Sequence, residues 1–248
     1  MLSEWQREQY RRQTMVRELG DAGQWSMLKA KVLIIGCGGL GSPVALYLAA
    51  MGIGTLGLVD SDRVELANLP RQILFTEEEI DQAKADIAAG RLRRQNHDLT
   101  FVPHPVRVTA ENIAELIAGY GVVVECADNF ATKQLVSDAC VAAGKPFVHG
   151  SASGWTGEVL SWRPGCACYR CVFPVAPPHE PAAPLPGILG AVAGVVGTIQ
   201  ATEVVKLVTG AGEPLLNRLL RCNLLHHEWQ LVPLVPQPDC CCQSGSRR

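Results

Sequence analysis

The chain has 248 residues, 48% of them hydrophobic, which is enough to bury a large core, and we expect a single domain over residues 1–248. Its formal net charge is −2, from 22 basic and 24 acidic residues, so it lacks the basic surface of a nucleic-acid-binding protein. The N-terminus carries no secretory signal, and ten scattered cysteines form no disulfide framework, which favours the reducing cytoplasm.

In chain order, the first expected element is a charged helix over residues 3–18, part of a helical arm over residues 1–25. The following apolar and amphipathic stretches predict strand 31–36, helix 42–51, strand 54–59, helix 77–96, strand 100–104, helix 110–118, strand 122–126, helix 131–143 and strand 146–150. A β-rich stretch continues to residue 161. This alternation is typical of an α/β fold with a Rossmann-like, doubly wound, mainly parallel sheet and a β-rich C-terminal part.

The later part of the chain has a different composition. Proline and cysteine dominate residues 164–186, which we expect to form a mobile loop. The apolar stretch 187–199 ends short of the roughly 20 residues that a bilayer requires. We therefore predict a buried helix there rather than a membrane span, with Gly190 and Gly194 allowing another backbone to approach closely.

A glycine-rich turn supplies the first indication of function. Gly36, Gly38 and Gly41 match G-x-G-x-x-G, with Gly39 in the same turn, between an apolar strand and a helix. Asp60 ends the next strand, where its carboxylate can accept hydrogen bonds from ribose hydroxyls. The context predicts a nucleotide site, although glycines that serve only helix packing are the alternative.

The segment after Asp60 separates two kinds of nucleotide site. It contains Asn68, Arg71 and Gln72, followed by Lys84. A dehydrogenase does not need an arginine and a lysine beside its nucleotide, whereas phosphoryl or nucleotidyl transfer uses such cations to stabilise charge on a triphosphate. These residues favour transfer chemistry over NAD-dependent oxidoreduction.

The order of these motifs, followed by Cys126-Ala127-Asp128-Asn129, resembles the ThiF/MoeB/HesA adenylyltransferases, the bacterial relatives of ubiquitin-activating enzymes. The resemblance covers nearly the whole chain. It includes the arm sequence Tyr10-Arg11-Arg12-Gln13, the pair at Cys168 and Cys171, and the glycine-rich stretch 194–203. The stretch 72–76, Q-I-L-F-T, is similar to the ThiF branch.

The resemblance implies that a carrier protein's C-terminal glycine carboxylate attacks the α-phosphorus of ATP, giving an acyl-adenylate and pyrophosphate. Asp128 would hold Mg²⁺, a cation that prefers carboxylate and phosphate oxygens. Arg71 and Lys84 would bind the β- and γ-phosphates. A helix N-cap is the alternative role for Asp128. The residues implied in nucleotide binding are Gly36, Gly38, Gly39, Gly41, Asp60, Asn68, Arg71, Gln72, Lys84, Asp128 and Asn129.

By the same resemblance, Arg12 reaches the ATP site of a neighbouring protomer, so a homodimer with shared sites is implied. Gln9 stands where the family has its first arm arginine, and a solvated helix face is the alternative for Arg12.

A zinc site is expected from the cysteines. Cys168 and Cys171 form a C-x-x-C half-site. The family has a second C-x-x-C, whereas this tail reads Cys240-Cys241-Cys242, so the choice of two ligands stays open, with Cys240 and Cys242 as the candidate pair. Free thiols or a site without metal are the alternatives, and Cys166 is a spare ligand.

The partner implied by the resemblance is a small ubiquitin-like sulfur-carrier protein that ends in Gly-Gly. The family's reactive loop cysteine falls near Ala183 here, and no cysteine lies between Cys171 and Cys222, so a separate sulfur-donor protein is expected. A thiamine-pathway ThiS-type carrier is favoured and a molybdopterin-pathway MoaD-type carrier is the alternative. A non-catalytic nucleotide-binding scaffold is the other class of function.

Overall fold

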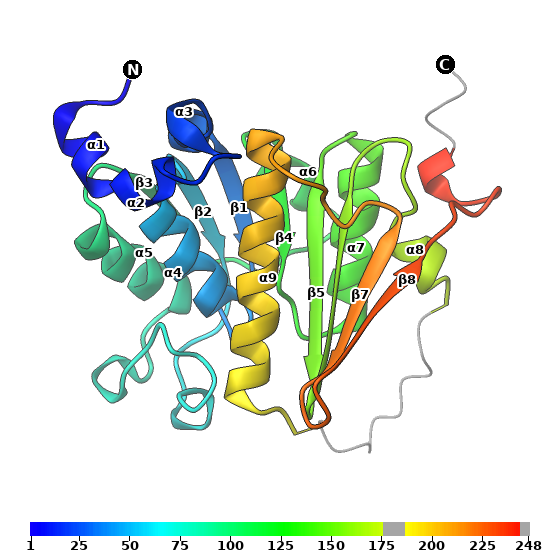
Figure 1. Ribbon diagram of the computed structural model, residues 1–248. Helices are drawn as coiled ribbons and strands as arrows, with labels where there is room; N and C mark the ends of the chain where they lie inside the picture. The colour runs from blue at the N-terminus through cyan, green and yellow to red at the C-terminus, as the bar shows by residue number, and fades with distance from the viewer. Residues whose placement is uncertain (176–186, 244–248) are drawn as a thin grey trace.

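Eight strands form one sheet in the computed structural model, which describes residues 1–175 and 187–243 (Figure 1). The order across the sheet is β3-β2-β1-β4-β5-β6-β7-β8. The first five strands pair in parallel and the last four, from β5 onward, pair antiparallel. The strands are β1 Lys31–Ile35, β2 Thr55–Val59, β3 Thr100–His104, β4 Val122–Glu125, β5 Phe147–Ser153, β6 Thr156–Trp162, β7 Arg218–Asn223 and β8 Glu228–Pro233.

Helices cover both faces of the sheet, which confirms the predicted doubly wound α/β fold (Figure 1). The α-helices are α1 Glu4–Gln9, α2 Arg11–Thr14, α3 Gly20–Lys29, α4 Gly41–Met51, α5 Lys84–Gln95, α6 Ile113–Ala118, α7 Phe130–Ala142, α8 Tyr169–Val172 and α9 Gly190–Thr209. Side chains of α4, α5 and α9 share one core with the sheet, and those of α6, α7 and α8 share the other.

The central strands form where the sequence is apolar without interruption. In β1 only Lys31 is exposed, and all four residues of β4 are buried, because helices lie on both sides of these strands. Ile34 pairs with Val124 across the parallel β1–β4 ladder, and the carboxyl ends of both strands therefore meet at one edge. This edge carries the glycine turn and the loop with Asp128.

Two predicted helices differ from the structure. The helix expected over 3–18 is broken at Tyr10, whose side chain is 1% exposed and accepts a hydrogen bond from Asn96. The helix expected over 77–96 begins only at Lys84, because residues 77–79 form a single 3₁₀ turn and Asp81 has a left-handed φ of 65°. Helix α3 was not predicted, and α6 starts at 113 rather than 110.

The stretch 164–186, expected to be loop, contains the short helix α8, while residues 176–186 and the position near Ala183 lie outside the described residues. Helix α9 has the length and apolar composition of a membrane span. One face of α9 packs on the sheet and buries Gln200 and Glu203, as expected of a core helix.

Close backbone approach on α9 involves different glycines from those predicted. A Cβ on Gly190 would lie 2.3 Å from the carbonyl oxygen of Pro70, as expected, but a Cβ on Gly194 would meet nothing within 4 Å. The second close contact is at Gly197, where a Cβ would lie 2.6 Å from the carbonyl oxygen of Leu40 and 2.5 Å from Pro43. Helix α9 therefore presses against the start of α4.

We expect Gly197→Ala to destabilise the protein by about 1–3 kcal/mol, because its methyl group has no room beside the α4 backbone. The matched variant Gly194→Ala adds the same methyl group to the same helix in open space, and should raise stability by about 0.5–1 kcal/mol through helix propensity. Urea unfolding midpoints measure both effects. Equal shifts in the two variants would contradict the packing of α9 on α4.

Candidate functional site

The glycine turn joins β1 to α4 in a tight conformation. Gly36 has a left-handed φ of 94°, and its N–H donates to the carbonyl of Val59 at 2.8 Å. A Cβ on Gly41 would lie 1.8 Å from the carbonyl oxygen of Gly36, so only glycine fits at the start of the helix. No side chain caps the amino end of α4. Pro43 has no N–H and Ser42 already donates to a carbonyl of the turn at 2.9 Å, so the N–H groups without a partner among the described hydrogen bonds are those of residues 38–41, which can meet an anion such as phosphate.

Asp60 connects the end of β2 to this turn. One carboxylate oxygen accepts from the N–H of Cys37 and the other from the N–H of Asp62, both at 2.8 Å. Burial raises the pKa of Asp60, and the two N–H donors and the nearby Lys84 partly oppose that rise. Each carboxylate oxygen has a second acceptor position, so these contacts leave capacity for the predicted hydrogen bonds from ribose.

The segment from Asn68 to Gln72 lies over the glycine turn. A Cβ on Gly38 would lie 3.4 Å from the Gln72 amide nitrogen, and one on Gly39 would lie 3.5 Å from Cγ of Arg71. Asn68 and Gln72 are 7% and 4% exposed. Within the described part of the chain, neither Oδ1 of Asn68 nor Oε1 of Gln72 has a hydrogen-bond partner. An unsatisfied buried acceptor costs about 1–3 kcal/mol, so both oxygens suit a ligand with hydrogen-bond donors.

Two cations border the same edge. The guanidinium of Arg71 donates to the carbonyl of Ala67 at 2.9 Å. Lys84 is buried, and its ammonium lies 3.2 Å from a carboxylate oxygen of Asp62, whose side chain is 59% exposed. The sequence did not indicate this partner for Lys84. A buried ammonium paired with one exposed carboxylate can exchange that partner for a phosphate with little desolvation.

Asp128 is exposed on the loop that follows β4. The alternative role of helix N-cap belongs to its neighbour Asn129, whose side chain accepts from the N–H of Thr132 at 2.9 Å. The Asp128 carboxylate accepts only a longer contact, 3.3 Å, from the Asn129 amide among the hydrogen bonds of the described residues. Its oxygens are thus available to a cation such as Mg²⁺.

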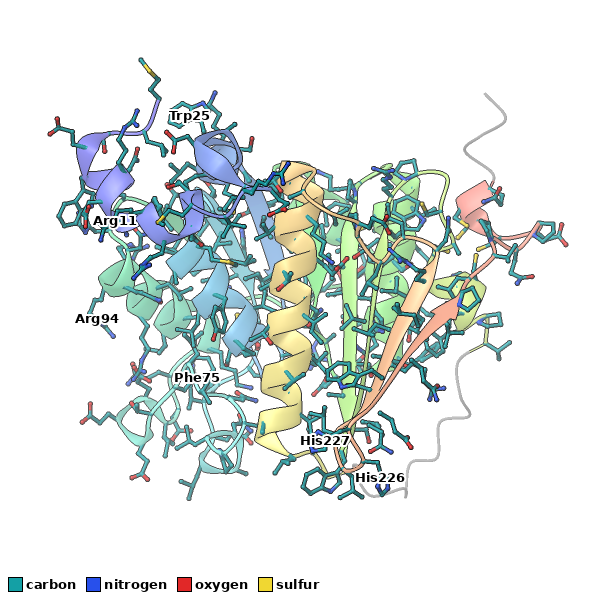
Figure 2. The ribbon with its side chains drawn as sticks, in the orientation of Figure 1. Arg11, Trp25, Phe75, Arg94, His226 and His227 are labelled. Atoms are coloured by element: carbon teal, nitrogen blue, oxygen red, sulfur yellow. The ribbon has the colours of Figure 1, made fainter. Side chains whose placement is uncertain are left out.

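Arg12 does not join these residues within one chain. It is exposed on α2, which packs at the carboxyl end of α4 through the hydrogen bond from Gln13 to the carbonyl of Met51. The glycine turn lies at the other end of α4, about 16 Å away for a helix of eleven residues. Figure 2 shows the neighbouring Arg11 at the upper left of the view, above Phe75.

A buried charged cluster beneath the Asp128 loop was not predicted. Glu125 is 1% exposed, and its carboxylate contacts Nδ1 of His149 at 2.6 Å and Nζ of Lys133 at 3.2 Å. Burial would raise the pKa of Glu125, but the charge of Lys133 and the His149 hydrogen bond outweigh it and hold the pKa below its usual value. A glutamate at the end of the apolar strand VVVE was the only sequence signal.

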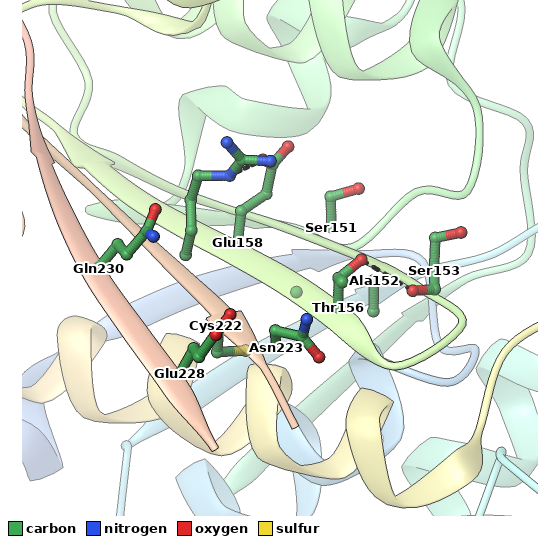
Figure 3. Close-up of a pocket in the computed structure, with 11 residues that line it drawn as sticks. Ser151, Ala152, Ser153, Thr156, Glu158, Cys222, Asn223, Glu228 and Gln230 are labelled. Atoms are coloured by element: carbon green, nitrogen blue, oxygen red, sulfur yellow. Dashed lines mark hydrogen bonds and ion pairs between the residues drawn. The ribbon is translucent and has the colours of Figure 1, made fainter. Parts of the chain in front are cut away.

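A polar pocket lies on the strands β5 to β8 (Figure 3). Glu158 and Arg221 form an ion pair of 4.0 Å across β6 and β7 in its wall. Glu158 pairs with Ser151, and Leu160 pairs with His149, so the register places the pocket on the same sheet face as His149. From the sequence this region was predicted only to be β-rich, and these residues were not singled out.

Four cysteines meet beside α8. The Sγ atoms of Cys168, Cys171, Cys240 and Cys242 all lie within 4.8 Å of one another. Cys168 and Cys240 are 3.4 Å apart, and Cys171 and Cys242 are 3.5 Å apart. A tetrahedral ion with metal–sulfur bonds of about 2.3 Å separates its ligands by about 3.8 Å, so the group fits zinc.

The other cysteines near this group are placed differently. Cys241 is exposed, and Cys166, the spare ligand, is buried outside the group. The N–H of Gln237 donates to Sγ of Cys171 at 3.4 Å, the kind of contact that supports a metal-bound thiolate. The tail therefore contributes its first and third cysteines, the candidate pair of the sequence analysis.

The comparisons with known proteins cover most of the chain. The ThiF family model matches residues 10–244. Adenylyltransferase and sulfurtransferase MOCS3 of Bos taurus is 44% identical over 96% of this chain and 53% of its own length. SAMP-activating enzyme E1 of Haloferax volcanii is 40% identical over 95% of this chain and 88% of its own length. Sulfur carrier protein adenylyltransferase of Thermus thermophilus is 38% identical, with coverages of 94% and 89%. The chain thus spans about half the length of the MOCS3 relatives.

Solved structures show the same fold. A structure of E. coli MccB with MccA-N7isoASN superposes with a TM-score of 0.86 at 24% identity, over 96% of this chain and 74% of MccB. The structure of E. coli MccB with ATP has a TM-score of 0.76 at 25% identity, over 88% and 67% of the two chains. Because the family model matches residues 10–244, nearly the whole chain, the protein belongs to the ThiF family.

Proposed function

We propose that the protein is an ATP-dependent adenylyltransferase that activates the C-terminal glycine carboxylate of a small ubiquitin-like sulfur-carrier protein. The observation that carries this proposal is the gathering of three features at the edge where β1 and β4 end. These are the uncapped amino end of α4, the cations Arg71 and Lys84, and the exposed carboxylate of Asp128. The names of the relatives from Haloferax volcanii and Thermus thermophilus support the same class of substrate.

The proposed reaction needs no covalent enzyme intermediate. A carboxylate oxygen of the carrier forms a bond to the α-phosphorus of ATP, and the bond from that phosphorus to the bridging oxygen breaks, releasing pyrophosphate. Arg71 and Lys84 stabilise the charge that develops on the leaving group. The free amides of the glycine turn and the unsatisfied oxygens of Asn68 and Gln72 orient the nucleotide. Mg²⁺ held by Asp128, when bound, would neutralise phosphate charge.

The finer assignments extend this proposal. The stretch 72–76 favours a ThiS-type carrier, whereas the relatives' names do not separate ThiS-type from MoaD-type carriers. We propose that a separate protein delivers sulfur, and that Arg12, exposed on α2, completes the ATP site of a second protomer in a homodimer. We propose a cytoplasmic location, because none of the ten cysteines, all of them described, pairs in a disulfide.

We further propose that the four-cysteine group holds a structural zinc ion. Zinc would join the turn at α8 to the tail and so fix two segments that lack an extensive core of their own. Cys241 takes no part in the group, because its side chain faces solvent.

ATP–pyrophosphate exchange tests the proposed activity. We expect exchange that depends on a Gly-Gly-ended carrier and falls by about 100-fold or more in Asp128→Ala, because the metal-bound charge stabilisation is lost. Glu115→Ala, which removes an exposed carboxylate from α6, is the matched control and should exchange normally. ThiS-type and MoaD-type carriers are assayed side by side. Binding of ATP without exchange for any carrier would favour the non-catalytic scaffold.

Metal analysis tests the zinc site. We expect about one zinc per chain in the protein purified without chelator, and its loss in both Cys168→Ser and Cys242→Ser, since three thiolates hold the ion poorly. Cys241→Ser should keep the metal and serves as the control. Zinc retained by Cys242→Ser but lost from Cys241→Ser would show that a different pair of tail cysteines binds it.

A further inference from the structure

The carboxylate of Glu125 reaches the loop that carries Asp128. Its Oε1 atom accepts from the N–H of Ala127 at 2.6 Å, and Ala127 directly precedes Asp128. The same segment passes against the glycine turn, because a Cβ on Gly36 would lie 2.8 Å from the carbonyl oxygen of Cys126. The direction in which the Asp128 side chain leaves the sheet therefore depends on a hydrogen bond to a buried charge.

Three elements hold that charge in place. Lys133 comes from α7 and also donates to the carbonyl of Gly150 at 2.8 Å. His149 comes from β5 and approaches the other carboxylate oxygen at 2.6 Å. Gln200 comes from α9 and donates to the backbone carbonyl of Glu125 at 2.9 Å. The charges of Glu125 and Lys133 compensate each other, and loss of either side-chain partner would leave the buried carboxylate with an uncompensated charge or an unmade hydrogen bond.

His149 is held in one orientation by its surroundings. Because Glu125 is ionised, Nδ1 of His149 is the donor, which leaves Nε2 as a bare acceptor. Nε2 is buried and has no partner among the described residues. Tyr169 packs on the ring with centroids 4.7 Å apart, and Phe173 lies at 6.4 Å. An unsatisfied buried nitrogen indicates that the fold retains His149 for the bond made by its other nitrogen.

We infer that Glu125 and His149 are positioning residues for Asp128: His149 orients the Glu125 carboxylate, and that carboxylate fixes the Ala127–Asp128 backbone for metal-dependent nucleotide binding. This inference rests on the proposed function, since it assigns to Asp128 the Mg²⁺ that accompanies ATP. Neither Glu125 nor His149 contacts the nucleotide edge itself. Their effect is transmitted through one backbone N–H, as outer-shell partners of metal ligands act.

The test separates positioning from general stability by measuring ATP affinity by calorimetry with Mg²⁺ and with EDTA. We expect His149→Phe, which keeps an aromatic ring beside Tyr169 but removes the donor, to weaken ATP binding about 10-fold with Mg²⁺ and to leave binding in EDTA unchanged. His149→Asn places an amide nitrogen where Nδ1 was and should restore the Mg²⁺-dependent affinity. The matched control is His104→Phe, which removes the hydrogen bond between His104, at the end of β3, and Tyr120. It should leave ATP binding unchanged in both conditions.

Ala127→Pro tests the same hydrogen bond by removing its donor, the N–H that donates to Glu125, and leaves the buried charges intact. It should also lose affinity only with Mg²⁺. If a folded His149→Phe or Ala127→Pro variant binds ATP with wild-type affinity in Mg²⁺ while Asp128→Ala is impaired, the inference is overturned and the proposed role of Asp128 still stands. No effect of Mg²⁺ on ATP binding in the wild type or in Asp128→Ala would overturn the role of Asp128 and this inference with it.

Discussion

The main chains of β1 and β4 touch where the two strands end, and the arrangement of the candidate site depends on that contact. Residue 36 can carry no side chain because the carbonyl of Cys126 occupies the space, and the N–H of Cys126 bonds to the carbonyl of Ile35. The glycine turn leaves on one side of this junction and the Asp128 loop on the other. The free amides of the turn and the exposed carboxylate of Asp128 are thus related by rigid backbone, at the switch point where α/β sheets bind ligands.

Charge is distributed in layers around this junction. Innermost lies the compensated pair of Glu125 and Lys133, farther out lies Lys84 with one exposed partner, and at the surface lies Asp128. A polyanionic nucleotide with its metal ion would therefore meet cations whose partners are weakly held and an anion that is free to take a metal. Both side chains of the innermost pair are buried, which suits a role in holding the backbone in place rather than in binding a ligand.

The sequence predicted the elements that a single physical signal determines. Continuous apolar runs located β1 and β4, and the G-x-G-x-x-G spacing located the turn between β1 and α4. The helix over 77–96 was wrong because the Thr76–Glu79 capping box closes its own short turn and Asp81 adopts a left-handed conformation, which helical composition does not register. The roles assigned to Arg71, Lys84 and Arg12 stay predictions.

The buried cluster shows what a single sequence could not provide. Glu125, Lys133 and His149 are separated along the chain by eight and sixteen positions. Glutamate and lysine are typical surface residues and histidine is intermediate, so none of the three alone predicts a buried cluster. Only the packing of α7 and β5 on the end of β4 brings them together. The same holds for Gly197, whose need for close approach depends on where α4 begins and cannot be read from the composition of α9.

The four-cysteine group also imposes an order on the making of the protein. Cys168 and Cys171 leave the ribosome about 70 residues before Cys240 and Cys242, a delay on the order of ten seconds at usual rates of synthesis. During that interval the first pair has no partner pair, and the turn is held by its packing on the core and by the ion pair of Arg170 with Asp138 of α7. The four-cysteine group can therefore assemble only after the whole sheet, through β8, has been synthesised.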